Sequence, residues 1–389
     1  MSTLIVIASA SCVAALLTVA AELAARAWIR RRGGWYVWAP WHRTQLHVDL
    51  DALPSLEPVT RFEINGDGER GDPLPRDRRG MYRVLVAGGS AAEGWFLDQR
   101  SSWPGVLQEL LNSAAIRAQL GARFVHVGSI ARSLVPCAAI QRMLAQSLRR
   151  YDRLDLVLFM VGASDVVAWL ERGTPPAIED DATPIEWIFD EHPSLCFTWS
   201  PSQLALKRLV SRLHRRLLEP VRVRERAGAR FVELRRRRAR ALQWIDDVPD
   251  PEPMLACFEL HLRRMIATAR AKRARVIVVR QPWFEKDFTP EEEAAMWNFC
   301  VGRPYEEPTT RYYTHAVVAD LMRKVDDRAA AVCRELDVEH VDLMPVLERS
   351  LTTYYDFLHF TPLGARAVAE EIASAVCGAA VPTAATRSR

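Results

Sequence analysis

Short apolar runs alternate with amphipathic segments through most of the chain. Val106, Leu107, Leu110 and Leu111 recur at helical spacing, and the segment 137–151 continues in the same way. The apolar runs lie at 82–89, 122–128, 154–162, 274–282 and 339–346. Strands that alternate with helices predict a parallel α/β sheet, whose functional residues gather at the carboxyl edge of the strands.

The first residues of the chain are apolar on all sides. Between Ser2 and Ala21 there is no charged residue, and a helix of that length reaches roughly 30 Å, about one hydrocarbon core. We interpret residues 3–25 as an uncleaved membrane anchor within an anchor and basic flank at 1–32. A cleaved signal peptide is the rival reading, but it needs a basic region before the apolar run. The arginines follow the run instead, so the positive-inside rule places the remaining chain in the cytoplasm.

Composition shifts divide the rest of the chain. Proline, aspartate and glycine are frequent at 33–80, which predicts an irregular linker. A globular domain is expected at 81–377 and a disordered tail at 378–389. Within the domain, the pattern breaks at about 170–255, where a strongly basic stretch runs from Lys207 to Arg240. A solvated helical face is the favoured interpretation, and a cap or a surface that lies on anionic lipid is the alternative.

Charge and cysteine content exclude several classes of partner. The net charge of +4 is too small to indicate nucleic-acid binding. The seven cysteines show no paired spacing, so neither a disulfide framework nor a metal site is indicated, and a reducing compartment is weakly favoured. No cofactor is expected.

A glycine-flanked serine follows the first predicted strand of the domain. In Gly88-Gly89-Ser90-Ala91-Ala92-Glu93-Gly94, a turn from strand to helix exposes the Ser90 hydroxyl and leaves backbone N–H groups free to face an oxyanion. A dinucleotide site would need GxGxxG spacing, which is absent, and Glu93 would repel a pyrophosphate. Ser90 is therefore the candidate nucleophile.

The segment near the C-terminus carries the most specific pattern. Asp356 and His359 lie three residues apart, so on one helical turn the carboxylate can hold the imidazole and fix its tautomer. Thr361 is expected to cap the following helix, with Pro362 in its first turn. His126 and His261 lack such company and are expected to be structural.

Together these segments resemble the SGNH/GDSL hydrolase superfamily, in particular a membrane-tethered branch, over roughly residues 60–375. The resemblance implies a three-layer, flavodoxin-like fold. It also implies a catalytic triad of Ser90, His359 and Asp356, with an oxyanion hole formed by the N–H groups of Ser90 and Gly128 and the Ser164 side chain. The chain departs from the family pattern in having Gly89 where aspartate is commoner, and His126 and Ser164 where asparagine is usual.

The function implied is hydrolysis of a carboxylic ester through a covalent acyl-enzyme. The substrate would be an ester-bearing small molecule, lipid or glycan. Acyl transfer to, or deacetylation of, a sugar or lipid hydroxyl is one alternative, and a catalytically degenerate, membrane-tethered binding module is another.

Overall fold

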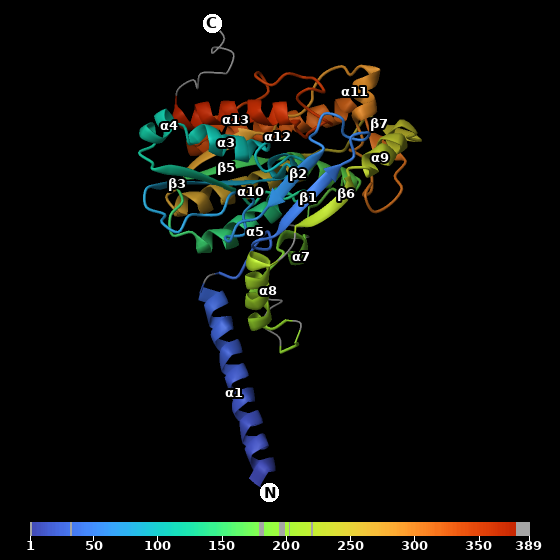
Figure 1. The fold of residues 1–389 in the computed structure, drawn as a ribbon. Coiled ribbons are helices and arrows are strands. Elements are labelled where there is room, and N and C mark those ends of the chain that lie inside the picture. The colour runs from blue at the N-terminus through green and yellow to red at the C-terminus, as the bar shows by residue number, and fades with distance from the viewer. Residues whose placement is uncertain are drawn as a thin grey trace.

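A computed structural model describes residues 2–31, 33–178, 183–193, 199–201, 203–218 and 221–378. Figure 1 shows an α/β domain from which one long helix, α1 (Ser2–Arg31), projects. Almost all of the predicted tail, 379–389, lies outside the described residues.

The domain is built on a five-stranded parallel sheet. Its strands are β3 (Met81–Gly88), β4 (Phe124–Ser129), β5 (Leu156–Val161), β8 (Arg275–Arg280) and β10 (Glu339–Val341). Their order is β10-β8-β5-β3-β4, so in chain order the sheet reads 2-1-3-4-5, the flavodoxin-like arrangement. Every residue of β5 is buried, because helices cover both faces of the sheet. The predicted fold class is confirmed.

Two layers of helices enclose the sheet. On one face, α3 (Trp103–Leu111) packs against α13 (Pro362–Cys377). On the other, α10 (Glu252–Ala271) packs against α5 (Cys137–Ser147) and α12 (His315–Leu336). The short helices α4 (Ala114–Gln119) and α6 (Ala163–Glu171) follow α3 and β5.

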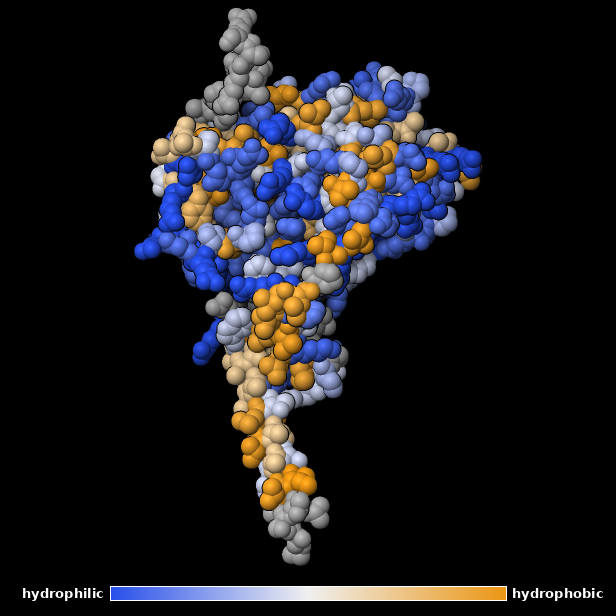
Figure 2. All heavy atoms as spheres, viewed as in Figure 1, coloured by the Kyte–Doolittle hydropathy of each residue, from blue (hydrophilic) through white to orange (hydrophobic). Residues whose placement is uncertain are grey.

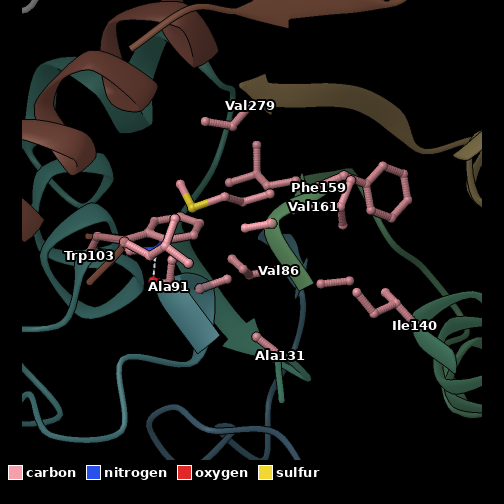
Figure 3. Close-up of a cluster of buried hydrophobic side chains, with 14 of the residues drawn as sticks. Val86, Ala91, Trp103, Ala131, Ile140, Phe159, Val161 and Val279 are labelled. Carbon is pink, nitrogen blue, oxygen red and sulfur yellow. Dashed lines mark hydrogen bonds between the residues drawn. The ribbon is translucent and has the colours of Figure 1, made fainter. Parts of the chain in front are cut away.

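The core supports the turn that carries Ser90. Side chains of Phe159 and Val161 from β5 lie on the side of the sheet toward Ile140 of α5 (Figure 3). From the other layer, Trp103 Nε1 donates to the carbonyl oxygen of Ala91 at 3.2 Å. The residue after Ser90 is therefore fixed to α3 by a buried hydrogen bond.

The segment 33–80 is part of the folded domain, and its prediction as an irregular linker is wrong. It contains β1 (Arg43–Val48) and β2 (Val59–Glu63), which form a second sheet with β6 (Arg222–Ala227) in the order β2-β1-β6. Leu46 and Phe62 are fully buried. Turn residues frequent between the two strands obscure their short alternating pattern.

The predicted insertion folds into several short elements. These are α7 (Ile185–Ile188), α8 (Ala205–Leu217), β6, α9 (Arg230–Ala239) and β7 (Gln243–Ile245), which pairs with β9 (Arg311–Tyr313). Helix α8 packs beside α1, whereas α9 contacts α11 (Pro290–Ala295). Because Arg212 of α8 and Arg238 of α9 are buried, the interpretation of this stretch as a solvated face fails for these two side chains.

Helix α1 is the one described helix that is long and apolar enough to cross a membrane, judged by length and composition alone. Its exposed surface is apolar over much of its length (Figure 2). Among the side chains of α1 from Val6 onward, the buried ones lie in its last turns, where Ala25 and Ile29 pack against Ala205 of α8. A signal sequence would pass the same test of length and composition.

Candidate active site

Ser90 lies at a tight turn between a strand and a helix, as predicted. β3 ends at Gly88, and the short helix α2 (Ser90–Glu93) begins at Ser90. A Cβ atom on Gly88 would lie 2.3 Å from the carbonyl oxygen of Met160, so only glycine allows the two strands to approach this closely. As the first residue of a helix, Ser90 has a backbone N–H without an acceptor inside that helix.

The structure brings Ser90, His359 and Asp356 together. His359 Nε2 lies 2.8 Å from Ser90 Oγ, and His359 Nδ1 lies 2.8 Å from Asp356 Oδ2. Asp356 is completely buried, whereas His359 keeps 15% of its side chain exposed. The three side chains form a continuous hydrogen-bonded chain that ends at a partly exposed hydroxyl.

The sequence spacing suggested that Asp356 and His359 share one helical turn, but the structure shows that they do not. They lie in a bend before α13, where Asp356 Oδ1 accepts the backbone N–H groups of Leu358 and His359, each at 2.9 Å. The carboxylate therefore folds its own loop and also orients the imidazole. Thr361 caps α13 by accepting from the N–H of Gly364, with Pro362 first in the helix, as predicted.

Trp297 is a contact of this site that the sequence did not reveal. Its Nε1 donates to Asp356 Oδ2 at 2.7 Å, and its ring packs edge-on against Phe231 of α9. Trp297 lies in a loop 59 residues before Asp356, and no sequence pattern links the two positions. The carboxylate thus accepts hydrogen bonds from an indole, an imidazole and two backbone N–H groups.

This environment shifts the pKa values of both charged partners. Burial alone would raise the pKa of Asp356. The charge and the hydrogen bond of His359 lower this pKa, as do the hydrogen bonds from the Leu358 backbone and the Trp297 side chain. Burial alone would lower the pKa of His359, but the Asp356 carboxylate, helped by Glu93, raises it. The pair therefore favours an ionised Asp356 and makes His359 a stronger base.

Glu93 is a second buried carboxylate near Ser90, His359 and Asp356. It accepts a hydrogen bond from the Ser133 hydroxyl, and burial raises its pKa. Arg70, which lies in the predicted linker, clamps the same helix: its guanidinium donates to the carbonyl oxygens of Glu93, Gly94 and Leu97. Arg70 therefore supports the turn that follows Ser90.

His126 has the structural role predicted for it. Its Nε2 lies 3.4 Å from the carboxylate of Glu69, which is fully buried and also accepts from Asn65 and Arg83. Burial alone would raise the pKa of Glu69, but Arg83 and these hydrogen bonds lower it. His261 is one of the buried residues of α10.

Ser164 lies beside the nucleophile turn, in the first turn of α6. A Cβ atom on Gly89 would come within 2.4 Å of Ser164 Oγ. Gly89 and Ser164, two of the three positions at which the sequence departs from the SGNH/GDSL pattern that it resembles, are therefore neighbours in space. A larger residue at position 89 would force the Ser164 hydroxyl to turn away.

Gly128 lies farther from Ser90 than its predicted role requires. It pairs with Leu85 inside the sheet, about 10 Å of extended strand before Gly88, and the direction of its missing Cβ is filled by the Glu69 carboxylate. The residue after β4 that reaches the nucleophile turn is Arg132, whose N–H donates to the carbonyl oxygen of Gly88 at 3.1 Å. The register thus brings residues 130–132, rather than Gly128, to the edge where Ser90 lies.

A small cavity opens beside Ser90. Its volume of about 10 Å³ holds roughly one water molecule. It is lined in part by Gly89, Ile140, Ser164, Gln281 and Leu358. Among the described residues, no group of three or more His, Cys, Asp or Glu side chains is arranged to hold a metal ion.

Comparisons with solved structures find matches over about three quarters of this chain. A catalytic mutant of Axe2, an acetylxylan esterase from Geobacillus stearothermophilus, matches with a TM-score of 0.41 and 11% identity, over 77% of this chain and 94% of that one. The psychrotrophic esterase EstA from Pseudoalteromonas sp. matches with a TM-score of 0.38 and 9% identity, over 76% and 96%. A lipolytic G-D-S-L family protein from Veillonella parvula DSM 2008 has a TM-score of 0.38 and 9% identity, over 75% and 95%.

These matches are to esterases and lipolytic proteins. No protein-family model and no curated protein matches the sequence. At such low identities, the function of this chain has to be inferred from its own residues.

Proposed function

We propose that this chain is a serine ester hydrolase of the SGNH/GDSL type. The observation that carries the proposal is the hydrogen-bonded chain from Ser90 Oγ through His359 to the buried Asp356, with 2.8 Å at each link. An imidazole held in this way, with its pKa raised by a carboxylate, is suited to remove a proton from a serine hydroxyl.

In the proposed reaction, Ser90 Oγ forms a bond to the ester carbonyl carbon while its proton moves to His359 Nε2. The tetrahedral intermediate then breaks its bond to the alcohol, which leaves with the proton from His359. A water molecule, deprotonated by His359, attacks the acyl-enzyme and releases the carboxylic acid and free Ser90. Asp356 stays ionised throughout and stabilises the imidazolium.

The oxyanion is proposed to be bound by the backbone N–H of Ser90 and the hydroxyl of Ser164. The support is that Ser90 begins α2 and that Ser164 Oγ lies next to Gly89. A further backbone donor would come from the loop at 130–132 in place of Gly128, since that loop reaches the carboxyl edge of β3. Donors placed where charge develops can contribute several kcal/mol each.

The same residues would also support acyl transfer, in which a sugar or lipid hydroxyl replaces water. The small cavity beside Ser90 favours a short acyl group in either reaction, because a longer one would require displacement of Ile140 or Leu358. Comparison of p-nitrophenyl acetate with longer esters measures this preference, and comparison of water with added alcohol acceptors separates hydrolysis from transfer.

Labelling with a fluorophosphonate probe tests the central proposal. The expected result is one adduct per chain that is lost in Ser90→Ala and His359→Ala, because only an activated serine reacts. Ser101→Ala, which removes a hydroxyl bonded to Glu57, is the matched control and should label normally. A wild-type chain that does not label would instead support the degenerate binding module.

We further propose that α1 anchors the domain in a membrane, with the domain on the cytoplasmic side. Its apolar length and the arginines at its C-terminal end support this assignment. Carbonate extraction of membranes should leave the full chain in the pellet. Protease treatment of intact and of opened vesicles reports the side, and cleavage of the domain from the outside of intact cells would contradict the cytoplasmic orientation.

A further inference from the structure

A cavity much larger than the one beside Ser90, which we call the foot cavity, lies where α1 and α8 meet the domain. Its volume is about 880 Å³, within the range of small-molecule sites. It is bounded by the last turns of α1, by α8 and by loops of the domain, and Trp28, Tyr36, Trp41 and Leu213 contribute to its walls.

The walls of this foot cavity are strongly cationic. Seven arginines line it against two aspartates, Asp67 and Asp152. The arginines are Arg31, Arg76, Arg78, Arg149, Arg150, Arg212 and Arg216. So many guanidinium groups around one space repel each other unless an anion compensates them.

Several of these arginines have no anionic partner. Arg212 is neutralised by Glu191, and Arg78 lies 3.7 Å from Asp67. Within the described ranges, in contrast, no carboxylate pairs with Arg31, Arg76, Arg149 or Arg216. Their guanidinium groups are therefore free to bind an anion, and phosphate suits the planar fork of arginine.

Aromatic rings fix part of the cavity wall. Arg150 and Arg212 lie over Tyr36, with guanidinium carbons 4.2 and 4.3 Å from the ring centre, and Arg216 lies 5.2 Å from Trp41. A site with fixed cations beside apolar rings suits a ligand that combines a phosphate with an apolar body.

The position of the cavity along α1 indicates where such a ligand would come from. Helix α1 has 30 residues, about 45 Å, which matches a bilayer with its headgroup layers. Trp28 and Arg31 in its last turn, which line the cavity, therefore lie at the level of the lipid phosphates when the helix spans the membrane.

We propose that the foot cavity binds the phosphate headgroup of an anionic phospholipid. The proposal rests on the membrane anchor proposed above, and it assigns the cavity a binding role separate from the reaction at Ser90. A lipid held there, beside α1 and α8, fixes the domain at a set height and orientation above the bilayer.

Native mass spectrometry of the full chain tests this binding. The protein is held in neutral detergent and offered equal amounts of phosphatidylglycerol and phosphatidylcholine. We expect selective retention of phosphatidylglycerol, and a loss of about tenfold or more in Arg76→Ala/Arg149→Ala, because two charge-assisted hydrogen bonds to phosphate are removed. Equal retention of the two lipids by the wild type would overturn the proposal.

A matched variant removes the same charge elsewhere. Arg236→Ala/Arg240→Ala changes two exposed arginines at the end of α9 and should bind phosphatidylglycerol like the wild type. An equal loss in both double variants would reveal a general charge effect and overturn the site.

Two further measurements separate the sources and the proposals. Inorganic phosphate should compete poorly with the lipid, and full competition by phosphate would overturn the lipid assignment. Binding of soluble dihexanoyl phosphatidylglycerol tests the site independently of the membrane anchor, because this lipid does not require α1 to span a bilayer. Fluorophosphonate labelling of Ser90 should be unchanged in Arg76→Ala/Arg149→Ala, so failure of the cavity and failure of the esterase are distinguishable.

Discussion

Helices α8 and α9 come from the same arginine-rich stretch but have different surroundings. In α9, Arg235 and Arg238 donate to the carbonyl oxygens of Ala295 and Asn298, at 3.0 and 3.2 Å. Arg238 also donates to the carboxylate of Glu293 at 3.0 Å. In α8, Arg212 donates to the carboxylate of Glu191 at 2.7 Å. The two helices differ in what they pack on, since one side of α8 packs against α1. Figure 1 shows α8 beside α1 and α9 at the other end of the domain.

The two helices therefore support different parts of the molecule. Phe231 of α9 packs on Trp297, which donates to Asp356, so α9 supports the candidate active site through Trp297. Helix α8 covers the last turns of α1. Its apolar side chains Val210, Leu213 and Leu217 are exposed. Arginine count alone could not distinguish the two, because a long side chain with five donors can satisfy buried carbonyls as well as face solvent.

The largest expected effect lies at the end of the molecule that α9 supports. Asp356→Asn should reduce kcat by roughly 10³- to 10⁴-fold, because His359 loses the partner that fixes its tautomer. In the wild type the raised pKa of His359 places the acid limb of kcat/KM above the ordinary histidine value of about 6.5. Without the carboxylate, burial should move that limb to lower pH.

Trp297→Phe is the matched change for the same pH profile. It keeps the Asp356 carboxylate and removes one hydrogen bond to it, so the loss of kcat and the shift of the acid limb should both be much smaller. If the two variants behave alike, Asp356 acts mainly through packing, and α9 contributes to catalysis more directly than proposed.

The next largest effect is expected at Ser164, which lies beside the Ser90 turn. Ser164→Ala should lower kcat by roughly 10²-fold with little change in KM, because an oxyanion forms only in the transition state. Steady-state kinetics on a soluble ester provide the measurement. A silent substitution would mean that backbone N–H groups alone bind the oxyanion.

A smaller effect is expected on stability, where a buried and an exposed arginine of α9 can be compared. Arg238→Ala should lower the free energy of unfolding by about 1 to 3 kcal/mol, since the buried carbonyl of Asn298 loses its donor. The exposed Arg236→Ala should change it by less than about 0.5 kcal/mol. Denaturant unfolding of the two variants checks the difference, and equal values would restore the interpretation of α9 as a solvated face.

The smallest effect on activity is expected at the α8 end. Deleting residues 2–21 keeps Glu22, whose carboxylate accepts the N–H groups of Ala205 and Leu206 at the start of α8. Deleting residues 2–32 also removes Ala25 and Ile29 and leaves the apolar side of α8 uncovered. Both forms should hydrolyse a soluble ester at the same rate per active site, but the shorter form should aggregate more in size-exclusion chromatography. Equal solubility would show that α8 does not need α1.

Local patterns were sufficient to predict the parallel sheet and to single out Ser90, His359 and Asp356, whose side chains the structure brings together. A buried strand followed by two glycines and a serine forms its turn from neighbouring residues, and Asp356, His359 and Thr361 likewise form their bend and helix cap within one short segment. These features depend on conformational preferences and hydrogen bonds that a few consecutive residues contain.

The tertiary structure alone decided the second sheet, the contact of Trp297 with Asp356, the position of Gly128 and the foot cavity. β6 has the sequence RVRERA and shows no alternation of buried and exposed side chains. It is a strand because it pairs with β1, about 180 residues earlier in the chain. The cavity likewise combines arginines from α1, the 66–78 loop, the 3-10 turn that follows α5 (Leu148–Arg150) and α8. Such features depend on contacts between distant segments, and the spacing of residues along the sequence does not encode which segments will meet.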